Sequence, residues 1–120
     1  MTTSEKATVL AWHDALNARD IDTLLELSSD DIEVGDARGA GQGHAALRDW
    51  AAGLNRTVTP GRLFIRDGVV VVEERIDDAD GAATVSAFRV VHDKVTSVFR
   101  HDDLASALAA TELTEADATS

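Results

Sequence analysis

The chain has 120 residues, a length that fits a single domain. Asp and Glu number 22 against 11 Lys and Arg, and the formal net charge of -11 disfavours nucleic acid and anionic membranes as partners. Cysteine is absent, which excludes disulfides, thiolate metal sites and a cysteine nucleophile. The residues after Met1 contain no continuous apolar segment of the kind found in signal peptides or membrane spans, so we expect a cytoplasmic protein.

The first part of the chain predicts two helices. Apolar residues recur at spacings of three and four within residues 9–16, which predicts a first helix that ends at residues 17–20. Asp20 or Asp22 can cap a short second helix that continues to Leu27.

A short strand and a third helix follow. Residues 32–36 alternate apolar and polar side chains, which predicts an edge strand. The glycines Gly35, Gly39, Gly41 and Gly43 predict a mobile turn before a third helix of about ten residues. The buried stripe expected for this helix consists of Leu47, Trp50, Ala51 and Leu54.

The periodicity becomes strand-like after residue 61, and short turns of Asp, Gly and Lys separate the apolar runs. Consecutive antiparallel strands are therefore expected. The predicted strands cover residues 62–66, 69–76, 82–92 and 95–101. Asp102 or Asp103 can cap a last helix. Residues 111–120 are acidic and small, which predicts a disordered tail after a domain of residues 1–110.

Together these elements predict an α+β fold in which three N-terminal helices cover one face of a strongly curved antiparallel sheet. The concave space between the helices and the sheet is the expected site of a small ligand. The longest predicted strand directs Val85, Ala87 and Val91 to the opposite face. An apolar strip of this kind is typical of subunit interfaces, so we expect a homodimer through the outer face of the sheet.

Two segments carry a resemblance to a known family, WHDALNARD at residues 12–20 and DIEVGD at residues 31–36. With the elements around them, they resemble the cone-shaped fold shared by nuclear transport factor 2, ketosteroid isomerase and the SnoaL-type polyketide cyclases, the NTF2-like superfamily. The resemblance covers about residues 7–110. It implies a homodimer and an isomerase-like or cyclase-like proton transfer on a small apolar metabolite, without a cofactor.

The same resemblance points to candidate catalytic residues. It places Asp36 on the general base of ketosteroid isomerase, Trp12 on its oxyanion tyrosine and Ser86 on its protonated aspartic acid. A carboxylate at the mouth of an apolar cavity is suited to removing a proton from a carbon next to a carbonyl group. Trp12 donates only through its indole N–H and Ser86 is a weaker donor than a carboxylic acid, so the oxyanion site departs from that of the isomerase.

A second group of candidates lies at the end of the last strand. If Val98 faces the cavity, strand alternation directs Arg100 and Asp102 inward as well. Asp102 resembles the late-strand acid of SnoaL-type cyclases, and it can equally cap the last helix. Arg100 is either a ligand clamp or the partner of Glu74 or Asp102 in a structural ion pair. The substrate-binding residues predicted in this way are Trp12, Leu16, Trp50, Glu74, Ser86, Phe88 and Val98.

The histidines do not have the spacing of metal ligands, so neither a metal site nor a cofactor is predicted. One of them, His13, is a candidate proton carrier next to Trp12.

Two functions stay open at this point. In the first, the chain is an enzyme or a binding protein for a small apolar carbonyl metabolite, with Asp36 as proton acceptor and Arg100 as anion partner. In the second, the chain is a non-catalytic dimer that serves as a binding or protein-interaction module. The two differ in the cavity, which is empty and ends in carboxylates in the first and is filled by Trp50, Phe64 and Phe88 in the second.

Overall fold

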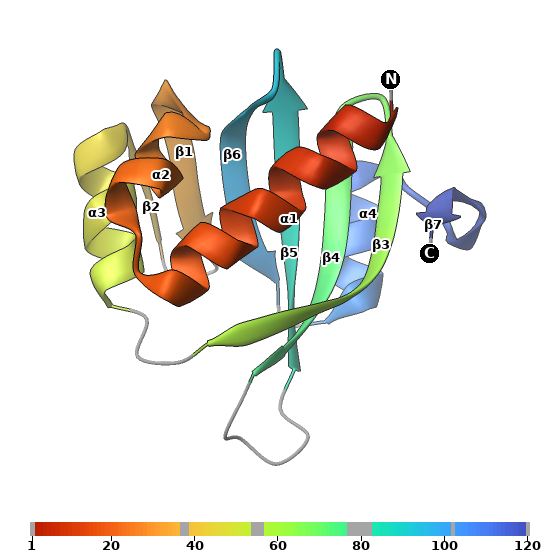
Figure 1. The fold of residues 1–120 in the computed structure, drawn as a ribbon. Helices are drawn as coiled ribbons and strands as arrows, with labels where there is room; N and C mark the ends of the chain where they lie inside the picture. Colours follow the sequence, from red (N-terminus) through yellow and green to blue (C-terminus); the bar gives the residue numbers. More distant parts are fainter. Residues whose placement is uncertain (1, 37–38, 54–56, 77–82, 102, 120) are drawn as a thin grey trace.

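The computed structural model describes residues 2–36, 39–53, 57–76, 83–101 and 103–119. Within them the chain forms four α-helices and a seven-stranded sheet (Figure 1). The helices are α1 (Thr2–Ala18), α2 (Ile21–Glu26), α3 (His44–Ala52) and α4 (Leu104–Thr111). The strands are β1 (Ser28–Asp36), β2 (Gly39–Gln42), β3 (Val58–Arg66), β4 (Val69–Ile76), β5 (Ala83–Val91), β6 (Lys94–His101) and β7 (Ala118–Thr119). None of the described helices is long and apolar enough to cross a lipid bilayer.

The strands form one sheet in the order β2-β1-β6-β5-β4-β3-β7. Strands β3 to β6 are consecutive antiparallel neighbours, as the turn residues between them predict. Strand β1 runs parallel to β6, so the sheet is mixed rather than purely antiparallel. The predicted α+β class, with helices packed on a curved sheet, is confirmed (Figure 1).

Strand β1 is longer and more central than the sequence predicts. The prediction of an edge strand followed by a mobile glycine turn is wrong, because Gly39–Gln42 form β2 and pair with β1 on its free side. A Cβ atom at Gly35 would lie only 2.7 Å from the carbonyl oxygen of Gly39. The two strands therefore approach this closely because residue 35 carries no side chain.

The inner face of the sheet is crossed by α1, and α2 and α3 pack beside it near β1 (Figure 1). Asn17 connects the end of α1 to the sheet, because its amide nitrogen donates to the Val58 carbonyl at 2.8 Å and its oxygen accepts from the Val58 N–H at 3.0 Å. This double hydrogen bond accounts for the start of β3 at Val58, ahead of the predicted start at residue 62. Residues buried between the helices and the sheet include Val9, Trp12, Leu16, Leu24, Ile32, Leu47, Val70, Val72, Phe88 and Val98.

The outer face of the sheet is covered in part by α4. A second apolar cluster forms there from Phe64, Val71, Val85, Ala87, Ala107 and Leu113. The prediction that β5 carries an exposed apolar strip is therefore wrong for two of its three residues. Val85 and Ala87 are only 5% and 9% exposed under the cover of α4. Val91, with 45% of its surface exposed, is the member of the strip that remains at the surface.

The C-terminal residues have local structure where the sequence predicts a disordered tail. After α4, Leu113 is buried in the outer cluster, and a 3-10 turn, η1 (Glu115–Asp117), leads into β7. The side chains of Thr114 and Asp117 form a capping box that satisfies the backbone N–H groups at this turn. Strand β7 then pairs with β3 at residues 63–64.

Asp103, one of the two expected caps of α4, is the residue that caps it, and we expect Asp103→Ala to lower the thermal midpoint at neutral pH. Its carboxylate accepts from the Ser106 N–H at 2.7 Å. This hydrogen bond, and to a smaller extent one from the Ser106 side chain, hold the pKa of Asp103 below its usual range. Because the folded-state pKa is lowered, the stabilisation is present above the unfolded-state pKa and is lost as pH falls through the folded-state pKa. Calorimetry from neutral to strongly acidic pH should show the difference between wild type and variant shrinking. Asp103→Asn, which keeps an acceptor for the Ser106 N–H but cannot ionise, is the matched control, and a pH-independent difference between wild type and Asp103→Ala would contradict the assignment.

Candidate functional site

Four polar side chains form a row across the inner face of the sheet, and we call them the polar row: His13 of α1, Glu74 of β4, Ser86 of β5 and Arg100 of β6. Ser86 and Arg100 are directly opposite each other in the β5–β6 register, so their side chains lie on the same face. His13, Glu74 and Ser86 are 1%, 2% and 1% exposed, and Arg100 is half-buried. Buried polar side chains of this kind require partners, which the row supplies in large part from its own members.

Two hydrogen bonds connect the buried part of the row. His13 Nε2 lies 2.5 Å from Glu74 Oε2, and the Ser86 hydroxyl donates to Glu74 Oε1 at 2.6 Å. The other ring nitrogen, His13 Nδ1, lies 2.9 Å from the carbonyl oxygen of Val9. A carbonyl oxygen can only accept, so Nδ1 carries a hydrogen.

The proton count of the His13–Glu74 pair follows from this geometry. With a hydrogen on Nδ1, the contact between Nε2 and Oε2 is a hydrogen bond only if one further proton lies between them. The pair is either a neutral imidazole with a protonated acid or an imidazolium with a carboxylate. Both states have zero net charge, which lowers the desolvation penalty that a lone buried charge would bring.

Aromatic rings surround this pair. The Trp12 and Phe88 ring centroids lie 5.2 Å apart, edge to face, and the His13 ring lies 5.3 Å from Phe88. Trp12 also lies 5.9 Å from Trp50 of α3. The indole N–H of Trp12 donates to the Ser28 hydroxyl at 3.0 Å, so the only side-chain donor of this residue is already used within the protein.

Arg100 ends the row beside α3. Its guanidinium carbon lies 5.2 Å from the Trp50 ring centroid, a cation–π contact. The salt bridges of the described residues include none between Arg100 and Glu74, whose carboxyl oxygens contact His13 and Ser86. Among the described residues, the Arg100 Nε atom is buried and has no hydrogen-bond partner.

The remaining predicted site residues divide into two groups. Leu16, Phe88 and Val98 lie in the inner core, at 3%, 1% and 0% exposure. Asp36 is the last residue of β1, but its side chain lies outside the described residues, as does the whole of Asp102.

Phe64, which the second interpretation placed in the cavity, lies instead in the outer cluster, with the Arg62 guanidinium 5.1 Å from its ring. Trp50 and Phe88 both pack on the helix side. In the described part of the chain, no group of three or more His, Asp or Glu side chains could hold a metal ion.

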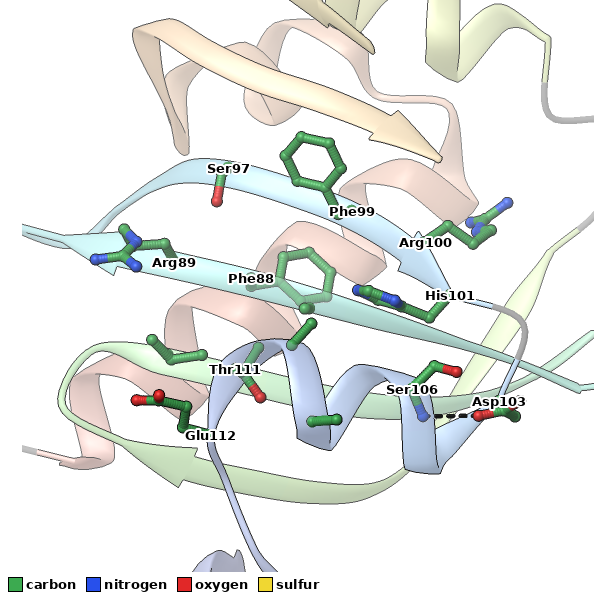
Figure 2. Close-up of a pocket in the computed structure, with 14 residues that line it drawn as sticks. Phe88, Arg89, Ser97, Phe99, Arg100, His101, Asp103, Ser106, Thr111 and Glu112 are labelled. Atoms are coloured by element: carbon green, nitrogen blue, oxygen red, sulfur yellow. Dashed lines mark hydrogen bonds between the residues drawn. The ribbon is translucent and has the colours of Figure 1, made fainter. Parts of the chain in front are cut away.

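The hollows lined by described residues that we identify lie on the outer face. A groove of about 740 Å³ runs between α4 and strands β5 and β6, as Figure 2 shows. A smaller hollow of about 330 Å³ shares Arg89, Ser97 and Phe99 with it and extends to Asp31 and Glu33 of β1. Apart from Arg100, no member of the polar row lines these hollows.

Helices on the concave side of a curved sheet, with polar groups meeting on its inner face, define a cone-shaped α+β protein. Residues 9–105 match the sequence profile of the SnoaL-like domain, and the protein belongs to this family.

Solved structures show the same fold. One is a provisionally assigned ketosteroid isomerase from Kribbella flavida, 18% identical, with a TM-score of 0.71 over 85% of this chain and 79% of that chain. Another is a provisionally assigned polyketide cyclase from Sinorhizobium meliloti, 17% identical, with a TM-score of 0.71 over 78% of this chain and 93% of that chain. A third is TerC co-crystallised with polyporic acid, 19% identical, with a TM-score of 0.72 over 92% and 97%. No curated protein matches the sequence.

Because His13 and Glu74 share one proton, we expect Glu74→Gln to lower the stability less than Glu74→Leu does. In Glu74→Gln, the amide oxygen can still accept from Ser86 and the amide N–H can donate to His13 Nε2, so we expect a loss of less than about 1.5 kcal/mol. In Glu74→Leu, His13 and Ser86 are both left unpaired, each at a cost of about 1–3 kcal/mol. Urea unfolding of the two variants measures these losses. Equal losses would show that the pair exists only as an ion pair, which glutamine cannot replace.

Proposed function

We propose that this protein binds a small, largely apolar carbonyl compound on the inner side of the sheet and transfers a proton on it, without a cofactor. The reaction class is that of an isomerase or a cyclase, in which a proton leaves a carbon next to a carbonyl group. Membership of a family that includes ketosteroid isomerases and polyketide cyclases supports this class. TerC, a protein of the same fold, has been crystallised with a small organic acid, which supports ligand binding by the fold.

The observation that carries the proposal is the Arg100 side chain. A buried N–H without a partner costs about 1–3 kcal/mol, and a carbonyl oxygen placed at Nε would remove that cost. The cation would also stabilise the negative charge that develops on that oxygen when the neighbouring carbon loses its proton. Trp50, against which Arg100 packs, offers a flat apolar surface to the rest of the ligand.

Asp36 is the proposed proton acceptor. Its position in β1 supports this role. Gly35 of β1 pairs with Phe99 of β6, and because the two strands are parallel, the next residues along them, Asp36 and Arg100, are neighbours. A base and an oxyanion partner at adjacent strand positions can act on the same carbonyl compound. Asp102, two positions beyond Arg100, is the second candidate for an acid or base.

A non-catalytic binding or protein-interaction module is the second candidate function. The observation that favours it is the packing of the inner core, where Trp12, Phe88 and Val98 are 1%, 1% and 0% exposed. Side chains packed in this way occupy space that a substrate would need. A test of the first function must therefore detect proton transfer itself.

We expect the protein to catalyse exchange of the α-hydrogens of deoxybenzoin, a ketone without other reactive groups, for deuterium in D2O. Arg100→Met should slow this exchange about a hundredfold, the usual effect of removing one oxyanion donor. Proton NMR measures the exchange rate. Arg48→Met, on the exposed side of α3, is the control and should exchange at the wild-type rate. Wild-type exchange at the rate of buffer alone would favour the non-catalytic module.

We also propose that two copies of the chain associate through the outer face. The two outer hollows meet at Phe99, and their rim carries both Arg89 and the acidic pair Asp31 and Glu33. A two-fold axis near Phe99 can bring the arginine of one copy opposite the acids of the other. The exposed Val91 at the end of β5 adds apolar surface to the same region.

Phe99→Glu should convert this dimer into monomers, because it places a charge in the apolar centre of the interface. Sedimentation velocity at micromolar concentration distinguishes the two states. Ala45→Glu, on the exposed side of α3, is the matched control and should leave the dimer intact. A wild-type protein that sediments as a monomer would rule out the interface.

A further inference from the structure

The groove on the outer face has an apolar middle. On the sheet side it is lined by Ala87 and Phe99, which are paired residues of β5 and β6. Helix α4 lines the other side through Ala109 and Ala110. The volume of about 740 Å³ lies within the range of about 300–1,000 Å³ that is typical of small-molecule sites. The groove is therefore large enough to hold the apolar body of a small ligand.

One end of the groove carries two groups of opposite charge, Arg89 and Glu112. Arg66, Val69 and Arg89 are paired positions of β3, β4 and β5, so they form one row across the sheet. The Arg66 guanidinium donates to the carbonyl oxygen of Glu112, which places Glu112 beside the same row. Figure 2 shows the side chains of Arg89 and Glu112 at this end of the groove and Asp103 at the other end.

Neither of these two charges is neutralised within the described part of the chain. Its salt bridges include none with Arg89 or Glu112, although the sequence has 22 acidic residues against 11 basic ones. The strand neighbours of Arg89 in the register, Val69 and Ser97, carry no charge. Arg89 and Glu112 are both exposed, so a ligand in the groove can reach them from the solvent.

We infer that this end of the groove binds a zwitterion with an apolar body, which is the chemistry of a free apolar amino acid. The carboxylate of the ligand pairs with Arg89, whose guanidinium can donate two parallel hydrogen bonds. The ammonium group of the ligand donates to the Glu112 carboxylate. The apolar body lies along Ala87, Phe99 and α4, where its surface is removed from water.

The charges around the groove favour a zwitterion over a simple anion. The net charge of -11 repels an anion from the protein as a whole, and a zwitterion has no net charge. Glu112 would oppose an anion next to Arg89, whereas it becomes a partner of a ligand that also carries an ammonium group. The groove lies on the outer face, so this inference does not depend on the carbonyl site proposed for the inner side.

Arg89 is also the residue that faces Asp31 and Glu33 of a second copy in the dimer proposed above. The ligand and the second copy are therefore alternative partners of this arginine. Wherever that dimer forms, saturating phenylalanine should shift it toward monomers in sedimentation velocity. A dimer that binds phenylalanine without dissociating would show that the ligand carboxylate does not pair with Arg89.

The test compares three ligands that share a phenylethyl body: phenylalanine, phenylpropanoate, which lacks the ammonium group, and phenethylamine, which lacks the carboxylate. Titration of the nitrogen-labelled protein, followed by NMR, gives the dissociation constants and locates the site. We expect wild type to bind phenylalanine about fivefold more tightly than either of the others, the upper end of what one exposed ion pair contributes. The amide signals of Ala87, Phe99 and Ala110 should shift, and the indole signals of Trp12 and Trp50 on the inner side should not.

The variants separate the two charges. Arg89→Gln should make phenylalanine bind like phenethylamine, and Glu112→Gln should make it bind like phenylpropanoate. Arg75→Gln, an exposed arginine that does not line the groove, is the matched control and should keep the wild-type ratios. Ala110→Phe should weaken all three ligands because it fills the groove, whereas Ala105→Phe, on an exposed position of α4 outside the groove, should not.

Two results with the wild-type protein would overturn the inference. Equal affinity for the three ligands would show that the charged groups do not select the ligand. Millimolar phenylalanine that leaves the groove signals unchanged, or that shifts only the two indole signals, would show that the groove is not the site. Neither result would contradict the carbonyl site on the inner side, which the exchange of deoxybenzoin hydrogens tests separately.

Discussion

The hydrogen bond between His13 and Glu74 is the constraint on which the inner side of this protein depends. Neither group can be left alone at this depth, because a single unpaired charge in an apolar core is strongly unfavourable. Helix α1 must therefore keep the rotation and the axial position at which its histidine meets the middle of the sheet. The residue before it, Trp12, is thereby fixed between Phe88 and Ser28. One polar contact in this way determines how the aromatic core packs.

Most of the fold could be predicted from the sequence, because its signals are local. The helical spacing of α1 and the turn residues between β3 and β6 each lie within a few neighbouring positions. Strand β2 could not be predicted, since Gly39–Gln42 have almost no side chains in which an alternation could be seen. The position of α4 on the outer face of the sheet could not be predicted from the sequence either. Its residues are nearly all small or apolar, so they do not indicate which face of the sheet it covers.

Strand alternation pointed to Glu74 and Arg100, and the family resemblance pointed to Ser86; the strand register places all three on one face. The contact between Glu74 and His13 could not be predicted. The two residues are 61 positions apart, and the periodicity of a sequence does not indicate which helix residue contacts which strand residue. The apolar run Val70 and Val72 before Glu74 was the available signal that this carboxyl group is buried and needs a partner. The roles of Asp36 and Asp102 stay predictions, since their side chains lie outside the described residues.

The short strands at the two lateral edges of the sheet bear on the tendency of the protein to aggregate. One lateral edge is β2, with four residues, and the other is β7, with two. Short outer strands of this kind leave few free backbone groups for another chain to extend, which is one of the ways in which proteins avoid edge-to-edge aggregation. Strand β2 covers residues 33–36 of β1 and β7 covers residues 63–64 of β3, so each protects only part of the longer strand beside it. A side chain at residue 35 would push β2 away and expose the edge of β1, so its first effect would be loss of solubility rather than loss of the core.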